Sequence, residues 1–164
     1  GLRGSWHGQR FTMAANKKPP NKGAALALAI CIPLTAGFEG LRQYVYRDPV
    51  GIPTFCFGET ANPQWGRTYS IEECTAILSP RVAQAIAEVQ SCTTAELSPQ
   101  RLAALGSFAY NVGGAAYCKS TLNRRINAGD PNACQELDRW VNARGVKLPG
   151  LVKRRAEERK LCES

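Results

Sequence analysis

The cysteines constrain this chain more than any other feature of its sequence. Seven of them occur in 164 residues, at positions 31, 56, 74, 92, 118, 134 and 162. The sequence has no CxxC pair and only one histidine, so no metal site is expected. Cysteines at this density are typical of exported proteins, because disulfides persist in oxidising compartments. We therefore expect an exported chain with up to three disulfides and one thiol left over.

The sequence leaves the pairing of these cysteines open, since six paired cysteines allow many connectivities. From the order of the cysteines along the expected helices, our hypothesis pairs Cys92 with Cys118 and Cys134 with Cys162. Cys31, Cys56 and Cys74 then remain as the set that can exchange partners.

The N-terminal region divides into two parts. Residues 1–12 show no periodicity and resemble vector-derived sequence. Residues 13–38 have the layout of an export signal, with basic residues before an uncharged run at 23–38. That run is shorter than the roughly 20 apolar residues of a stable membrane span, and no obvious cleavage site precedes Glu39. We expect an uncleaved export or anchor segment, with a cleaved signal or a buried first helix as alternatives.

The remaining residues, 39–164, predict a single α+β catalytic domain. Between Tyr44 and Thr60, glycines and a proline separate aromatic and β-branched residues, which predicts a small antiparallel hairpin sheet. After Arg67 we expect helices to the end of the chain. Residues that favour helix starts mark where these helices begin: Ser70, Ser98-Pro99, Ser120, Asp130-Pro131 and Pro149-Gly150.

The net charge of the chain is +8 at pH 7, which favours an anionic partner. Nucleic acid, acidic lipid and anionic cell wall all carry the required charge. No recognition helix with interleaved aromatic residues is visible, so we expect no nucleic-acid partner. A non-enzymatic cationic binding protein remains an alternative function.

Two carboxyl groups near the start of the sheet point to glycosidic-bond cleavage. Glu39 ends an apolar segment, where poor solvation favours the protonated form that a general acid needs. Asp48 lies on a polar turn nine residues later and should stay ionised. Two carboxyl groups in contrasting surroundings are the usual catalytic residues of glycosidases.

The segment around these carboxyl groups carries a family resemblance. Glu39-Gly-Leu-Arg-x-x-x-Tyr46-x-Asp48-x-x-Gly51-x-x-Thr54-x-x-x-Gly58-x-Thr60 resembles the active-site signature of T-even-phage-type lysozymes, glycoside hydrolase family 24. Residues 107–113, 138–140 and 148–158 resemble further segments of that family, so the resemblance spans residues 26–162. It implies a lysozyme-like fold, with the active-site cleft between the small sheet and a mainly helical body.

The resemblance also implies an activity, which is hydrolysis of the β-1,4 bond between N-acetylmuramic acid and N-acetylglucosamine in peptidoglycan. Glu39 would be the general acid, and Asp48 and Thr54 would hold the attacking water. The family is regarded as inverting, which implies roughly 6.5–9.5 Å between the two carboxyl groups. No cofactor and a monomeric enzyme are expected. A lytic transglycosylase acting on the same bond is the enzymatic alternative, although it needs no water-orienting pair.

Further residues receive roles from the same resemblance. Tyr110 and Asn111 would contact sugar across the cleft, with Glu59 and Arg139 as additional candidate substrate contacts. Glu59 stands where many relatives carry His, which puts the role of this position in doubt. Arg154 or Arg155 would orient Glu39, and the sequence does not decide between them.

The uncharged run next to Glu39 resembles the signal-anchor-release segments of some endolysins. This resemblance implies an enzyme held inactive at the host inner membrane and later released to the periplasm. Cys31 lies within the run and could then exchange disulfides with Cys56 or Cys74, which would make it a redox switch. The alternative is an inert buried thiol.

Overall fold

The structure is a computed structural model that describes residues 21–164. The proposed vector-derived residues and most of the basic stretch lie outside the described residues. The elements follow the order α1 (Lys22–Glu39), β1 (Arg42–Arg47), β2 (Pro53–Cys56), α2 (Ile71–Cys92), α3 (Pro99–Val112), α4 (Gly114–Lys119), α5 (Thr121–Asn127), the 3-10 helix η1 (Ala133–Arg139), β3 (Asn142–Ala143), β4 (Val146–Lys147) and α6 (Pro149–Glu163).

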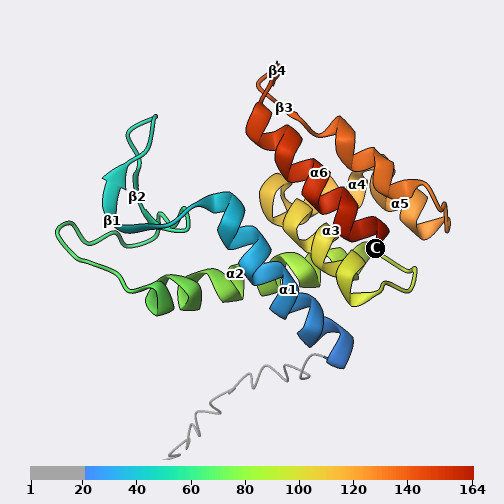
Figure 1. Ribbon diagram of the computed structural model, residues 1–164, viewed down its shortest axis with the longest axis horizontal. Helices are drawn as coiled ribbons and strands as arrows, with labels where there is room; N and C mark the ends of the chain where they lie inside the picture. Colours follow the sequence, from blue (N-terminus) through green and yellow to red (C-terminus); the bar gives the residue numbers. More distant parts are fainter. Residues whose placement is uncertain (1–20) are drawn as a thin grey trace, which may run out of the picture.

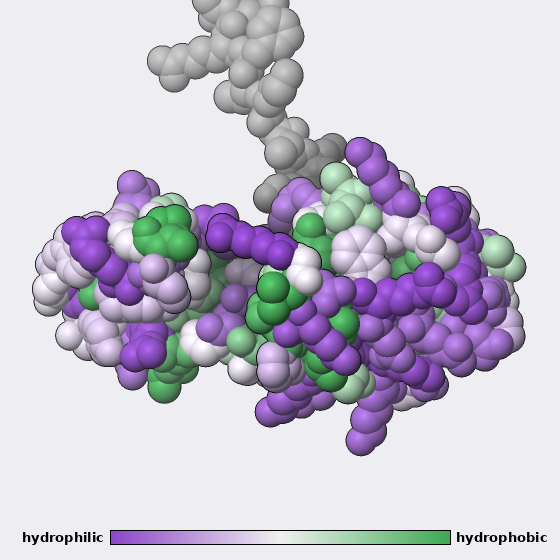
Figure 2. All heavy atoms as spheres, turned by 90° about the horizontal axis from the view of Figure 1, so that it is seen from above, coloured by the Kyte–Doolittle hydropathy of each residue, from purple (hydrophilic) through white to green (hydrophobic). Residues whose placement is uncertain are grey.

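The expected α+β fold is confirmed. Strands β1 and β2 form an antiparallel hairpin at one end of the molecule, and helices α3 to α6 form a body at the other (Figure 1). Helices α1 and α2 run between these two parts (Figure 1). Seen from above, the molecule has two bulges with a hollow between them (Figure 2). The small sheet and the helical body therefore have room for a cleft between them.

Helix α3 is the centre of the core, and its neighbours are α1, α2 and α6. Every residue from Leu102 to Ala109 is buried. The predicted caps are confirmed, because the Ser70 hydroxyl accepts from the Glu73 amide at 3.0 Å and the Ser98 hydroxyl accepts from the Arg101 amide at 3.1 Å. These bonds satisfy free backbone amides in the first turns of the helices, which fixes where α2 and α3 begin. The two helices in turn support the site.

The C-terminal region departs from the expectation of helices after Arg67. Residues 142–147 form a short hairpin, β3–β4, whose turn residues Arg144 and Gly145 both have positive φ. Each strand has two residues, too few to show an alternating pattern in the sequence. The helix expected after Asp130-Pro131 is instead the 3-10 helix η1.

Helix α1 packs against α2 and α3 along a narrow stripe of small residues. Ala24, Ala27, Cys31 and Thr35 are buried, at the spacing of one helix face. Pro33 does not end the helix, which continues to Glu39. On α3, a Cβ added to Gly106 would lie 3.3 Å from the Cys31 sulfur, so the two helices approach closely here. This docking places Glu39 at the edge of the helical body.

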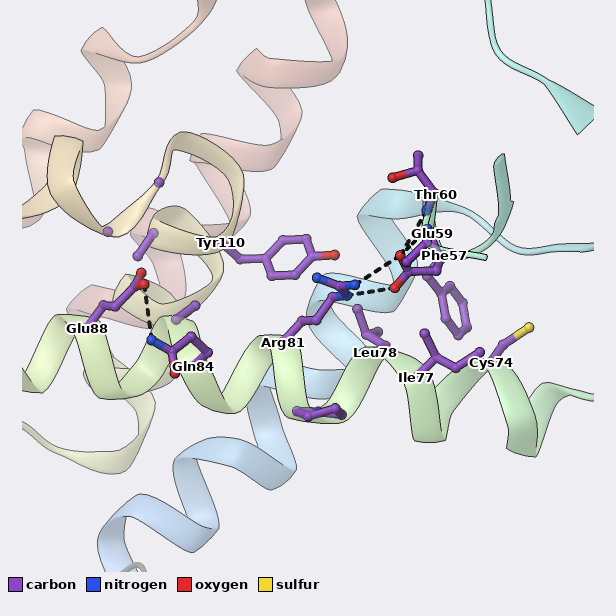
Figure 3. Close-up of a pocket in the computed structure, with 17 residues that line it drawn as sticks. Phe57, Glu59, Thr60, Cys74, Ile77, Leu78, Arg81, Gln84, Glu88 and Tyr110 are labelled. Carbon is purple, nitrogen blue, oxygen red and sulfur yellow. Dashed lines mark hydrogen bonds and ion pairs between the residues drawn. The ribbon is translucent and has the colours of Figure 1, made fainter. Parts of the chain in front are cut away.

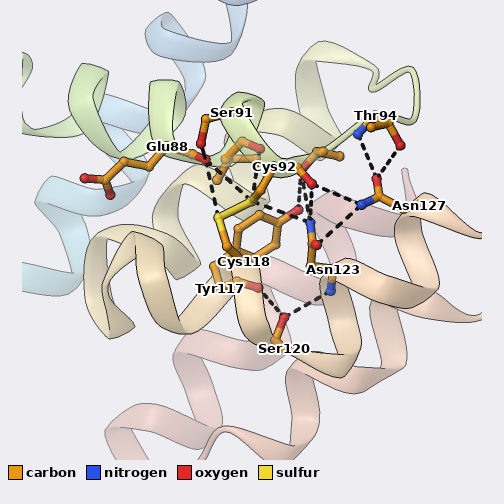
Figure 4. Close-up of a disulfide and its surroundings, with 11 residues drawn as sticks. Glu88, Ser91, Cys92, Thr94, Tyr117, Cys118, Ser120, Asn123 and Asn127 are labelled. Atoms are coloured by element: carbon orange, nitrogen blue, oxygen red, sulfur yellow. Dashed lines mark hydrogen bonds between the residues drawn. A yellow bond between two sulfur atoms is a disulfide. The ribbon is translucent and has the colours of Figure 1, made fainter.

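Three disulfides tie the elements together. Cys92–Cys118 joins the end of α2 to α4 (Figure 4), and Cys134–Cys162 joins η1 to α6. These are the two pairs that the sequence-based hypothesis contained. Cys56–Cys74 joins the hairpin to α2. This third bond fixes the position of the hairpin relative to the long helix that lies along the cleft.

Candidate active site

Glu39 is the last residue of α1, and its position depends on how that helix ends. Gly40 caps the helix at φ 73°, a conformation that glycine adopts without strain, and its amide donates to the Ala36 carbonyl at 3.2 Å. The chain then enters β1 at Arg42. The Glu39 side chain is 25% exposed, so it can meet a substrate while its neighbours hold it.

The structure distinguishes the two candidate arginines. Arg154 donates to the Glu39 carboxylate at 2.9 Å, and its side chain is 5% exposed. Arg155 instead donates to Glu158 at 2.6 Å and to the Trp140 carbonyl at 2.9 Å. Burial lowers the pKa of Arg155, which the Glu158 charge partly offsets. Arg154 is thus in contact with Glu39, and Arg155 is not.

Glu158 holds both arginines in place. It is fully buried on α6, forms ion pairs with Arg154 and Arg155, and accepts from the Ser107 hydroxyl at 2.7 Å. Arg154 also donates to the Ser107 carbonyl at 3.0 Å. Since Ser107 lies on α3, this buried network fixes the Arg154 guanidinium from two helices and so fixes the carboxylate of Glu39.

Asp48 follows β1 at the hairpin turn, Thr54 lies in β2, and both side chains bond to the backbone of Ile52. One Asp48 carboxylate oxygen accepts from the amides of Val50 and Ile52 at 3.0 and 2.8 Å. The Thr54 hydroxyl donates to the Ile52 carbonyl at 2.9 Å and is buried. The second Asp48 oxygen and the lone pairs of the Thr54 hydroxyl oxygen are not used by these bonds, so both groups can still accept hydrogen bonds.

A cleft of about 770 Å³ lies between residues 57–61, which follow the hairpin, and helices α2, α3 and α4. Glu39, Asp48 and Thr54 are not among the residues that line it. One face of α2 forms its floor, and Figure 3 shows Arg81, Gln84 and Glu88 from this helix in a row. Residues 57–61 close one end, and Tyr110 reaches into the cleft from α3 (Figure 3). A cleft of this volume can hold several sugar rings, in line with the usual range for ligand sites.

Two of the four predicted substrate contacts line this cleft. Tyr110 is half-buried, and burial followed by the Glu39 charge raises the pKa of its hydroxyl, which remains a donor at neutral pH. Glu59 also lines the cleft. By contrast, Asn111 accepts from Arg155, and Arg139 is 78% exposed on η1 and pairs with Glu136 at 3.2 Å. Asn111 and Arg139 are not among the residues that line the cleft.

In this conformation Cys31 has not exchanged with Cys56 or Cys74. Within the described residues it is a free, buried thiol, and Cys56 is bonded to Cys74. The Cys31 sulfur packs close to Gly106 in the core, so in this conformation it has the packing role that was the alternative.

Two groups at this site were not among the predicted site residues, namely Glu158 with Ser107, and Arg81. Glu158 belongs to the segment 148–158 that resembles the family, and its spacing of four and three residues from the two arginines places all three on one side of α6. Arg81 gave no signal, because its partner Glu59 lies 22 residues away in the sequence.

A hairpin carrying two polar acceptors, a helix-end carboxyl held by arginine and a neighbouring cleft are the features of a glycosidase of the lysozyme class. The family model described as phage lysozyme matches residues 36–158, and the chain belongs to this family. The predicted resemblance and enzyme class are therefore confirmed.

Relatives and solved structures agree with this assignment. The chain is 38% identical over 128 residues to the SAR-endolysin of Bacteriophage PS119, covering 77% of each. It is 35% identical over 148 residues to the SAR-endolysin of Pseudomonas phage phiKMV, covering 87% of this chain and 91% of that one. Its fold resembles the muramidase domain of SpmX from Asticaccaulis excentricus, with a TM-score of 0.73, 30% identity and coverage of 81% and 94%.

Proposed function

We propose that the protein is an endolysin that hydrolyses the β-1,4 bond between N-acetylmuramic acid and N-acetylglucosamine in host peptidoglycan. The observation that carries this proposal is the Glu39 carboxyl, held by Arg154 at 2.9 Å where α1 meets the hairpin. Membership of the phage lysozyme family and relatives named endolysins support the substrate. The formal charge of +8 suits an anionic cell wall.

In this proposal Glu39 protonates the glycosidic oxygen as the bond to the anomeric carbon breaks. Arg154 positions the carboxyl, and Tyr110 donates to the sugar from the opposite wall of the cleft. The Asp48 carboxylate and the Thr54 hydroxyl accept hydrogen bonds from a water, which attacks the anomeric carbon from the other face. The proton that this water loses passes to Asp48. Because the water attacks from the face opposite the leaving group, the configuration inverts. The bonds of Asp48 and Thr54 to the Ile52 backbone keep their remaining acceptors oriented.

The products distinguish this reaction from that of a lytic transglycosylase. We expect digestion of purified peptidoglycan to release fragments with new reducing ends, because water is the nucleophile. Mass spectrometry of the fragments before and after borohydride reduction measures this directly. Fragments that end in anhydro-muramic acid and resist reduction would instead identify a transglycosylase, and release of no fragments would favour a cationic binding protein.

We also propose that α1 anchors the protein in the host inner membrane before release to the periplasm. Within residues 21–164, α1 is the one helix long and apolar enough to cross a membrane by length and composition. Its 18 residues span about 27 Å, slightly less than a bilayer core. The side chains that α1 buries in the fold are small. Moving α1 from the bilayer to the core of the fold, or back, therefore costs little free energy. Undocking α1 would also remove Glu39 from Arg154.

A reporter fusion tests the membrane proposal. Residues 13–38 fused to a reporter active only in the periplasm should give membrane-bound, active reporter that retains the segment. Leu26→Lys and Ile30→Lys together should abolish export, because each charge in the apolar run opposes insertion by roughly 2.5–3.5 kcal/mol. A reporter that stays in the cytoplasm, or one released with the segment removed, would contradict the anchor.

A further inference from the structure

We infer that Arg81 is a positioning residue that, through Glu59, holds the turn at residues 55–59 against the general acid. This inference rests on the proposed function, because it concerns the same reaction. Arg81 lies on α2, in the helical floor of the cleft, whereas Glu59 belongs to the segment after β2 (Figure 3). The two residues therefore connect the floor of the cleft to the segment that closes one end of it.

The Glu59 carboxylate is fully engaged by protein groups. Arg81 donates to both of its oxygens, at 2.6 and 3.0 Å. The amides of Thr60 and Ala61 donate to one of them at 2.9 and 2.8 Å. Burial raises the pKa of Glu59, but the hydrogen bonds from Ala61 and Arg81 outweigh it, and the net shift is downward. Glu59 is thus an ionised anchor for the turn, which explains why it lines the cleft without offering a free oxygen to sugar.

The turn itself is closed and attached to α2 at two points. Phe55 and Glu59 exchange both backbone hydrogen bonds, at 2.9 and 2.8 Å. The Cys56–Cys74 disulfide is one attachment, and the Glu59–Arg81 pair is the other. Cys74 and Arg81 are seven residues apart, so they lie on one face of α2, separated by about 10.5 Å along its axis. A turn held at two points cannot rotate about either of them.

Gly58 lies between the two attachments and next to the general acid. Its φ is 82°, and a Cβ added there would lie 3.6 Å from a Glu39 carboxylate oxygen. The backbone of the turn is therefore in close approach to Glu39. Without Arg81, the disulfide would be the remaining one of these two attachments to α2, so this backbone could shift relative to Glu39. Misplacement of about 1 Å at a reacting group can cost up to a hundredfold in rate.

A second ion pair provides a matched control. Arg67 and Glu73 also join the segment after the hairpin to α2, at 3.2 Å. Arg67 is about as exposed as Arg81, at 45% against 54%, but Glu73 is 46% exposed whereas Glu59 is 8% exposed. Neither Arg67 nor Glu73 lines the cleft. Arg67→Met therefore removes the same charge and the same kind of bridge as Arg81→Met, without affecting the turn beside Glu39.

We expect Arg81→Met to lower kcat on purified peptidoglycan roughly tenfold with KM nearly unchanged, and Arg67→Met to change neither. Glu59→Gln, which keeps an acceptor for the two amides, should lower kcat by a similar factor. The double variant should be no slower than either single variant, because the two single substitutions remove the same contact between Arg81 and Glu59. Arg81→Lys, which retains one donor, should recover part of the rate.

Three kinetic results would overturn the inference: unchanged kcat in Arg81→Met, an increase in KM alone, or effects of Arg81→Met and Glu59→Gln that multiply. The last two would indicate that Arg81 contacts substrate directly. Hydrogen exchange of residues 55–61 gives an independent readout, which should rise in Arg81→Met but not in Arg67→Met. Unchanged exchange would also overturn the inference. A wild-type protein that releases no fragments would instead refute the proposed function, and the exchange experiment would still decide whether Arg81 holds the turn.

Discussion

Replacing Glu158 with Gln is expected to lower the free energy of unfolding by about 3–5 kcal/mol, the usual cost of breaking a buried ion pair from one side. Glu158 is fully buried and is the shared partner of Arg154 and Arg155. The amide keeps the shape of the carboxyl but leaves two buried guanidinium groups with one fewer negative charge. The same change should reduce lysis, because Arg154 would no longer be held in position against Glu39.

Chemical denaturation of the oxidised protein measures this loss. Glu163→Gln on the same helix is the control, since Glu163 is 44% exposed and pairs with Arg159 at 2.6 Å. An exposed pair contributes about 0–1 kcal/mol, so this variant should unfold close to the wild type. Equal stabilities of the two variants would show that the network does not hold α6 against α3.

Local features of the site could be predicted from the sequence. The end of the first helix at Glu39, the hairpin and the starts of α2 and α3 follow from apolar patterning, turn residues and caps within a few positions of one another. The family resemblance supplied the spacing from Glu39 to Thr54. The class of fold and of enzyme followed from these short-range signals.

Contacts between distant segments could not be predicted in the same way. Arg154 and Arg155 are adjacent, and only the packing of α6 against α3 decides which of them reaches Glu39. The bond from the buried Arg155 of α6 to the side-chain oxygen of Asn111 on α3 has no counterpart in the local sequence either. The partner of Glu59 depends on how the hairpin meets α2. These contacts arise from tertiary packing, which no local pattern records.

The second large effect concerns Glu39→Gln. The amide can still accept a hydrogen bond from Arg154, and Arg154 keeps its bonds to Glu158 and to Ser107, so the fold should be preserved. The amide cannot donate a proton to the glycosidic oxygen, so the leaving group would depart as an alkoxide. Loss of a general acid typically costs about 10²–10⁴-fold in rate. We therefore expect this variant to be folded and almost inactive.

The most direct test of the account is the rate at which wild type, Glu39→Gln and Glu163→Gln clear a suspension of Gram-negative cells with a permeabilised outer membrane. The account predicts rapid clearing by the wild type and by Glu163→Gln, and a rate at least about a hundredfold lower for Glu39→Gln. Thermal unfolding of the three proteins serves as the control for folding. Clearing by folded Glu39→Gln at a rate close to that of the wild type would show that Glu39 is not the general acid.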